Sequence, residues 1–278
     1  MNINNLLRDN IRNLKAYSSA RDEYKDITND MVFIDANENP FETDVNRYPD
    51  PQQTKVKERL SEIKGIPTNQ ILLGNGSDEV LDLIFRAFCE PNLDKIITLP
   101  PTYGMYSVLA ELNAVENIEI PLKSDFQPNK DEISNAAHSQ AKLLFLCSPN
   151  NPTANSFDAE HIEWLIEDFN GIAVIDEAYI DFSKQESWLS RLEKYPNLII
   201  TQTLSKAYGL AGIRLGVCYA SKEIISVLNK IKPPYNVNEL TQIKALERLN
   251  RIDSVDTEVK YILKERKKLK KALKSIEL

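Results

Sequence analysis

The chain has 278 residues, 42% of them hydrophobic, so it can bury a sizeable core in one large domain and part of a second. Its net charge of −7 and pI near 5.1 argue against a nucleic-acid partner, because such proteins gather positive charge on one face. We expect a soluble cytoplasmic protein with no membrane partner, since no signal-peptide pattern and no apolar run of about 18 residues occurs. Three widely spaced cysteines predict neither a disulfide framework nor a metal site.

The first 50 residues are polar and are interrupted by prolines, which break any long helix or strand. We expect residues 1–50 to form an arm over a larger body. At the other end, residues 256–278 place apolar side chains on one helical stripe among lysines. This pattern favours a long solvated helix over a helix that binds a membrane or a partner.

Between these ends, short apolar runs rich in β-branched residues alternate with segments of helical period. The alternation predicts an α/β body over residues 51–255, a three-layer fold with a mainly parallel sheet and helices on both faces. Helical spacing predicts helices over 78–89, 104–113 and 158–169. The expected seven strands are 71–73, 95–99, 117–120, 142–147, 171–176, 197–202 and 214–219.

The segment TLSKAYGLAGIRLG (203–216) carries the strongest chemical signal, because it places Lys206 just after an expected strand. An isolated Ser-Lys pair is usually a surface turn. Here, hydroxyl residues precede the lysine and glycines and an arginine follow it. The lysine amine could bond to an aldehyde cofactor whose phosphate is held by neighbouring side chains. These neighbours are Thr203, Ser205 and Arg214.

Polar residues also follow two other strands. Asp176 ends the apolar run GIAVID and could pair with a protonated ring nitrogen, while Tyr179 could reach an oxygen of the same ring. In SPNNPT (148–153), two prolines fix a turn that could aim the amide of Asn151 at that oxygen. Each motif alone also fits an ordinary loop or strand end.

A fourth motif, GNGSDE (74–79), lies between a strand and a helix. Its glycines permit close approach, and the N–H groups of Ser77 and Asp78 at the helix start could bind an anion. It lacks the third glycine of a dinucleotide fingerprint. Four such motifs after strands predict one cofactor site at the carboxyl edge of the sheet.

Together these motifs resemble the fold-type I pyridoxal-phosphate aminotransferases, and within them the histidinol-phosphate aminotransferase family. The resemblance covers most of the chain and implies a pyridoxal 5'-phosphate cofactor, with Lys206, Asp176 and Tyr179 as catalytic residues. The motifs that carry it are NIRNLKAYSSARDE (10–23), DANENP (35–40), NRYPDP (46–51), GNGSDE, PPTYGMY (100–106), SPNNPT, DEAY (176–179) and TLSKAYGLAGIRLG.

The resemblance further implies that Tyr103 stacks on the cofactor ring and that Tyr48 reaches the cofactor phosphate of a neighbouring subunit. The active unit would then be a homodimer. Tyr17 and Asn37 would line the substrate side, although simple interface packing also accounts for Tyr17 and Tyr48. The small-molecule partners implied are histidinol phosphate as amino donor and 2-oxoglutarate as 2-oxo acid.

The sequence departs from the family pattern in two places. Ala154 stands where a glycine usually follows SPNNPT, which costs about 1 kcal/mol if that residue has positive φ. The small C-terminal domain is expected to be largely absent, so that residues 256–278 begin the interdomain helix. Three alternatives stay open: an aromatic amino-acid aminotransferase, an amino-acid phosphate decarboxylase of the same fold, and a truncated cofactor-binding protein with little activity.

Overall fold

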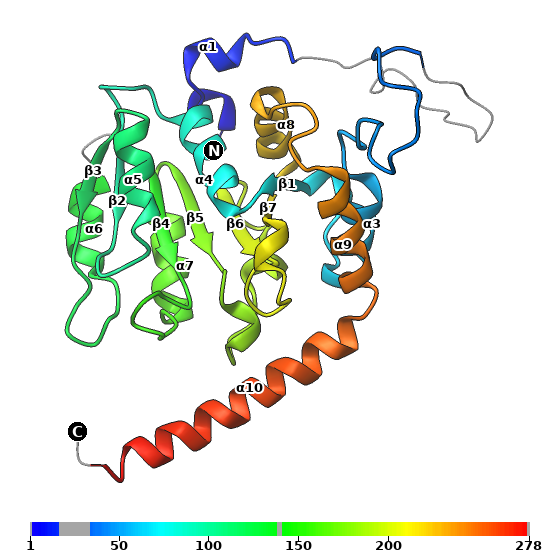
Figure 1. Ribbon diagram of the computed structural model, residues 1–278. Coiled ribbons are helices and arrows are strands. Elements are labelled where there is room, and N and C mark those ends of the chain that lie inside the picture. The colour runs from blue at the N-terminus through cyan, green and yellow to red at the C-terminus, as the bar shows by residue number, and fades with distance from the viewer. Residues whose placement is uncertain (1, 17–33, 138–140, 277–278) are drawn as a thin grey trace.

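The computed structural model describes residues 2–16, 34–137 and 141–276. At its centre is a seven-stranded sheet in the order β1-β7-β6-β5-β4-β2-β3 (Figure 1). Only β7 runs antiparallel to its neighbours β1 and β6, so the expected mainly parallel sheet is confirmed. The strands are β1 Ile71–Asn75, β2 Lys95–Thr98, β3 Glu116–Glu119, β4 Ala141–Cys147, β5 Ile172–Asp176, β6 Leu198–Thr203 and β7 Leu215–Ala220.

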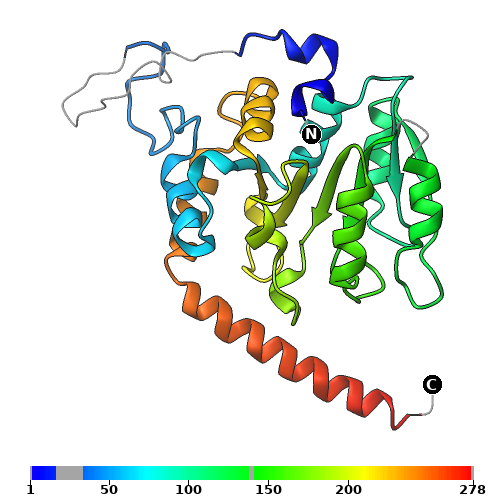
Figure 2. The same ribbon diagram turned by 180° about the vertical axis from the view of Figure 1, so that it is seen from behind.

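Helices cover both faces of this sheet, which gives the expected three-layer α/β/α architecture. On one face pack α4 (Ser77–Phe88), α5 (Met105–Leu112) and α8 (Lys222–Ile231). The other face packs against α3, α6, α7, α9 and the start of α10; Figure 2 shows α6 and α7, in green, from this side. Their bounds are α3 Thr54–Lys64, α6 Lys130–Ala137, α7 Ala159–Asp168, α9 Glu239–Leu249 and α10 Ile252–Leu273.

The central strands are buried on both faces, which explains their continuous apolar sequences. In β4, Leu143 and Phe145 pack on the α4 side, whereas Leu144 and Leu146 pack on the α7 side. Successive strand side chains point to opposite faces, so each strand contributes to both cores. The carboxyl ends of β4, β5 and β6 therefore meet at one edge, held from both sides.

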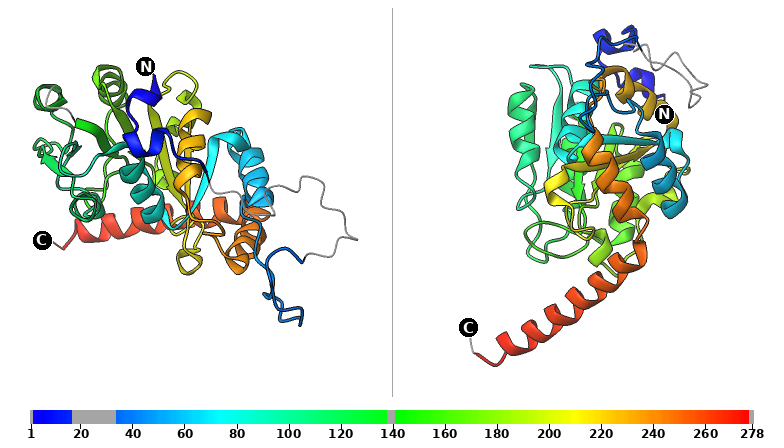
Figure 3. Two further views of the ribbon diagram at one scale, coloured as in Figure 1. Left: turned by 90° about the horizontal axis from the view of Figure 1, so that it is seen from above. Right: turned by 45° about the vertical axis from the view of Figure 1, so that its right-hand side comes forward.

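The two ends of the chain differ in how they contact this body. Near the N-terminus, η1 (Ile3–Asn5), α1 (Asp9–Arg12) and the segment between them bury Ile3, Leu7 and Ile11 against the α4 face. At the other end, α10 buries only Val255 and Val259 and then extends away from the body (Figure 3). In the part of the chain that the structure describes, no helix is long and apolar enough to cross a membrane.

Candidate active site

Ten of the residues expected at the cofactor site line one cavity of about 170 Å³. They come from five separate stretches of sequence that the sheet brings together at the carboxyl edge. The same cavity is also lined by Cys147, Ala178 and Ala211. The expected residues in it are Ser77, Asp78, Tyr103, Asn151, Asp176, Tyr179, Thr203, Ser205, Lys206 and Arg214.

Lys206 lies in a loop between β6 and η5 (Ala211–Ile213) that is anchored on both sides of the lysine. Leu204 and Tyr208 are buried, and the Leu210 N–H donates to the Leu204 carbonyl at 3.0 Å. Between these anchors the Lys206 side chain is exposed to the cavity, with Nζ 5.4 Å from the centre of the Tyr179 ring. A primary amine is thus presented on a fixed loop.

Asp176 ends β5 and is buried, with 4% of its surface exposed. Its Oδ2 accepts a hydrogen bond from the Tyr106 hydroxyl at 2.7 Å, and Oδ1 accepts one from the Ala178 N–H at 3.1 Å. Burial raises the pKa of Asp176, although these hydrogen bonds oppose the rise. A carboxylate in this position would be stabilised by a cation in the cavity.

The other end of the cavity gathers anion-binding groups at the start of α4. Arg214 has a positive φ of 55° and places Nη2 3.7 Å from Asp78 Oδ2. Two glycines make room for this arrangement: a Cβ on Gly76 would lie 2.7 Å from Arg214 Nη2, and one on Gly216 would collide with the Ser77 N–H. Backbone donors, a helix N-terminus and a guanidinium together suit a phosphate.

Tyr103 lies between the two ends of the cavity, the one at Asp176 and the one at the start of α4. Its hydroxyl donates to Asp78 Oδ1 at 3.1 Å, and its ring meets Tyr106 edge to face with centroids 5.6 Å apart. Burial and the Asp78 carboxylate raise the pKa of Tyr103 to about 12, so the phenol keeps its proton.

The loop that carries Asn151 is closed by its own hydrogen bonds. The Ala154 N–H donates to the Asn150 carbonyl at 2.9 Å, and the Asn150 N–H donates to the Asn155 carbonyl at 2.8 Å. Ala154 adopts φ +60°, the left-handed conformation that glycine tolerates better. The departure from the family pattern therefore falls on a position with positive φ.

Two larger hollows differ in their relation to this site. One of about 490 Å³ adjoins it and shares Asn151 and Tyr179. Another, of about 710 Å³, is lined by Ile71, Lys57 and Lys222, at the amino end of β1. It therefore lies at the opposite end of that strand from the gathered polar groups, and we do not assign it to the chemistry.

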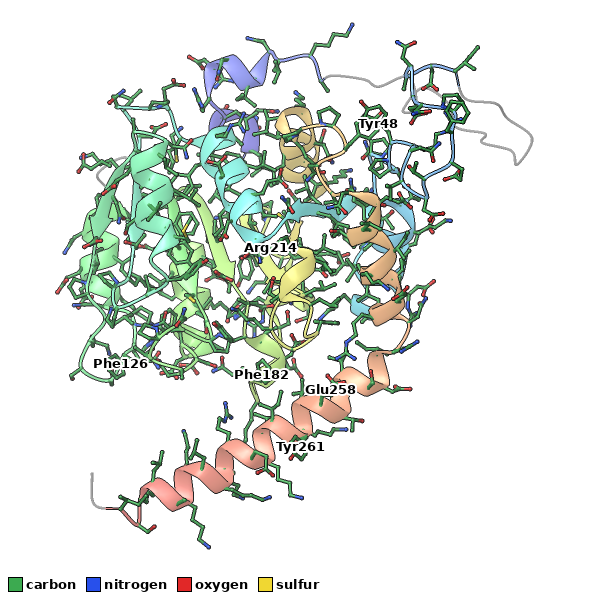
Figure 4. The ribbon with its side chains drawn as sticks, in the orientation of Figure 1. Tyr48, Phe126, Phe182, Arg214, Glu258 and Tyr261 are labelled. Carbon is green, nitrogen blue, oxygen red and sulfur yellow. The ribbon has the colours of Figure 1, made fainter. Side chains whose placement is uncertain are left out.

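Tyr48 and Asn37 do not line the cavity. Both line a separate hollow of about 430 Å³ that also includes Asn238 and Leu240. Figure 4 shows Tyr48 far from Arg214, on the segment that precedes α3. Tyr17 lies outside the described residues.

The aminotransferase class I and II family model matches residues 22–278. The chain belongs to the aminotransferase class I and II family. It is 63% identical over 98% of its length to the histidinol-phosphate aminotransferase of Flavobacterium johnsoniae, and 53% identical over 98% to that of Parabacteroides distasonis. It spans 78% of the length of each of these curated relatives.

Solved structures show the same fold at lower identity. The histidinol-phosphate aminotransferase of Sinorhizobium meliloti, solved with pyridoxal-5'-phosphate, matches with a TM-score of 0.76 and 24% identity. That match covers 81% of this chain and 62% of the other. An L-threonine-O-3-phosphate decarboxylase from Porphyromonas gingivalis matches with a TM-score of 0.65 and 25% identity, over 74% of this chain and 64% of the other.

Sequence reasoning missed two side chains that hold this candidate site. Tyr106 belongs to the motif PPTYGMY, but only the packing of α5 against the sheet shows that it bonds to Asp176. Glu177 is buried and accepts hydrogen bonds from the Ser187 hydroxyl at 2.6 Å and Gln202 Nε2 at 2.8 Å. A charged residue at the end of an otherwise apolar strand was the signal that could have indicated Glu177.

Proposed function

We propose that the protein is a histidinol-phosphate aminotransferase, which exchanges an amino group between histidinol phosphate and 2-oxoglutarate in histidine biosynthesis. One observation carries the proposal: the Lys206 amine and the buried Asp176 carboxylate line the same cavity. The family match and the relatives at 53% to 63% identity support the same activity.

The residues present fit a pyridoxal 5'-phosphate cofactor. When bound, this cofactor supplies an aldehyde and an electron-withdrawing ring that stabilises negative charge on a substrate carbon. The buried Asp176 carboxyl suits the protonated nitrogen of that ring. The room that Gly76 and Gly216 leave beside Arg214 and the α4 N-terminus suits its phosphate.

Each side chain then has a distinct role. Lys206 Nζ would hold the aldehyde carbon of the cofactor and would take a proton from the substrate carbon and return it. Asp176 would keep the ring nitrogen protonated, while Tyr179 and Asn151 would bind the ring oxygen. Tyr103 would pack on the ring, and the phosphate would be held by Ser77, Asp78, Thr203, Ser205 and Arg214.

Residues outside the cavity complete the proposal. We propose a cytoplasmic homodimer in which Tyr48 reaches the phosphate of the other subunit and Tyr17 and Asn37 contact the substrate. Residues 51–255 form the cofactor-binding domain, the arm precedes it, and 256–278 begin an interdomain helix. The exposed position of Tyr48, away from its own cavity, supports an action across subunits.

The substrate can be tested with a panel of amino donors. We expect turnover of histidinol phosphate with 2-oxoglutarate to exceed that of phenylalanine, tyrosine and threonine phosphate, measured by glutamate formation. Preference for an aromatic amino acid would instead support the first alternative, and release of carbon dioxide from threonine phosphate would support a decarboxylase. The likeness to the P. gingivalis decarboxylase is the reason to include that last substrate.

A further inference from the structure

The loop between α8 and α9 contains an asparagine whose side chain bonds to several segments. Asn236 Nδ2 donates to Glu79 Oε2 at 2.8 Å and to the Leu73 carbonyl at 3.0 Å. Its Oδ1 accepts from Lys232 Nζ at 3.0 Å and from Gln53 Nε2 at 3.4 Å. One amide therefore bridges β1, α4, the residue after α8 and the residue before α3.

Glu79 is the contact that connects this amide to the active site. The same Oε2 that accepts from Asn236 also accepts from the Asn75 N–H, at the end of β1. Asn75 is followed by Gly76, which lies under Arg214, and by Ser77 and Asp78, which line the cavity. The Glu79 carboxylate thus fixes the turn that presents the anion-binding N–H groups, and Asn236 fixes the carboxylate.

The neighbouring residue contacts the segment that carries Tyr48. Tyr235 has a positive φ of 56°, and its ring stacks on Tyr48 with centroids 4.6 Å apart. Positive φ on a bulky residue persists only where surrounding contacts hold it. Hydrogen bonds from Asn236 and Lys232, the latter also to the Pro51 carbonyl at 3.2 Å, provide such contacts.

From these contacts we propose that Asn236 is a positioning residue for the phosphate end of the site, acting through Glu79 on the turn between β1 and α4. The inference rests on the proposed cofactor. It assigns to Asn236 no contact with the cofactor itself. Its effect is therefore specific for ligands that carry the phosphate.

The experiment compares the dissociation constants of pyridoxal phosphate and of pyridoxal, which lacks the phosphate, in wild type and in Asn236→Ala. We expect the variant to bind pyridoxal phosphate about tenfold more weakly, as for the loss of one hydrogen bond to a charged group. Its affinity for pyridoxal should change by less than about twofold.

Gln242→Ala is the matched control. Gln242 is buried, and its Nε2 donates to the Val237 carbonyl at 3.0 Å and the Asp50 carbonyl at 3.1 Å. It contacts the same loop and the same N-terminal region but not Glu79. This variant should lose stability without changing the preference for the phosphorylated ligand.

The outcomes separate the two proposals. An Asn236→Ala protein with the wild-type preference would overturn the positioning role alone. A wild-type protein that binds the two ligands equally would overturn the proposed cofactor site, and the inference with it. If Asn236→Ala does not fold, Glu79→Gln tests the same turn from the other partner. We again expect a weaker preference for pyridoxal phosphate over pyridoxal in this variant. An unchanged preference would overturn the inference.

Discussion

The carboxyl edge of the sheet and residues 34–50 both contain residues that the sequence analysis expected at the site, but the fold positions the two sets differently. At the edge, Asp176 and Thr203 end strands that are buried on both faces. In the segment, the bonds are mostly local: the Tyr48 N–H and the Arg47 guanidinium both donate to Glu38. Tyr48 itself is 48% exposed. The core positions the first set, whereas the second depends on contacts outside it.

The largest expected effect is at the edge. Lys206→Ala should lower turnover by at least about three orders of magnitude, because the amine both holds the cofactor and moves the proton. Borohydride treatment followed by peptide mapping should find pyridoxal phosphate attached to Lys206 in wild type and nowhere in the variant. Lys222→Ala, at an exposed lysine on α8, should behave as wild type. Covalent attachment that survives in Lys206→Ala would refute the assignment.

Asp176→Asn should lower turnover by about two to three orders of magnitude, as does the loss of other buried electrostatic contacts to a reacting group. A neutral amide cannot hold the ring nitrogen protonated. The measurement is single-turnover kinetics with saturating cofactor. Unchanged rates would reduce Asp176 to a structural strand end.

The same substitution should have the opposite effect on the stability of the cofactor-free protein. Because the folded pKa of Asp176 is raised above its ordinary value of 3.8, wild type loses stability as the pH rises through the interval between the two pKa values. The amide that replaces this carboxyl does not titrate. The stability of the variant relative to wild type should therefore increase as the pH rises from about 4 to 7. Urea midpoints at the two pH values measure this gain. A difference between the proteins that does not depend on pH would contradict it.

These two regions also show how far sequence reasoning reached. All seven strands were expected to within two residues, because buried parallel strands are short, apolar and β-branched. Nine of the ten cavity residues followed from the rule that parallel strands end at one edge, and Tyr103 followed from the family resemblance. The sequence pattern did not predict the antiparallel direction of β7, although the connection 204–214 is too short for a crossover helix and could have indicated it.

What was not expected depends on contacts between distant segments. The helix α6 buries only Ile133, so its apolar period is weak, and it is held by packing rather than by pattern. Asn236 gives no signal in its own sequence context, since its bonds reach Leu73 and Glu79 far along the chain. For the same reason, a pattern of strand ends could not predict where Tyr48 lies relative to a cofactor.

A smaller effect is expected from a substitution of Tyr48, which tests the segment of residues 34–50 directly. Tyr48→Phe should weaken binding of pyridoxal phosphate by about tenfold, the loss of one hydrogen bond to a charged group. If Tyr48 acts across subunits, mixing this variant with Lys206→Ala should form sites that contain both Lys206 and Tyr48. Tight cofactor binding should return in the mixture. Absence of any such recovery in confirmed mixed dimers would place Tyr48 outside the neighbouring site.

The smallest effect concerns Ala154, which lies at the edge but outside the core. A left-handed φ costs an alanine about 1 to 2 kcal/mol, a cost that glycine avoids. The greater conformational entropy of glycine in the unfolded chain offsets about 0.4 to 1 kcal/mol of this gain in stability. Ala154→Gly should therefore stabilise the protein by about 0.5 to 1 kcal/mol. Ala272→Gly makes the same change in the last turn of the right-handed helix α10 and should not stabilise the protein, because glycine is a poorer helix former than alanine. A rise of the urea midpoint in Ala154→Gly alone, with cofactor affinity unchanged in both variants, would locate strain in the loop beside Asn151, whereas a fall in Ala154→Gly would show that the loop holds alanine at +60° without cost.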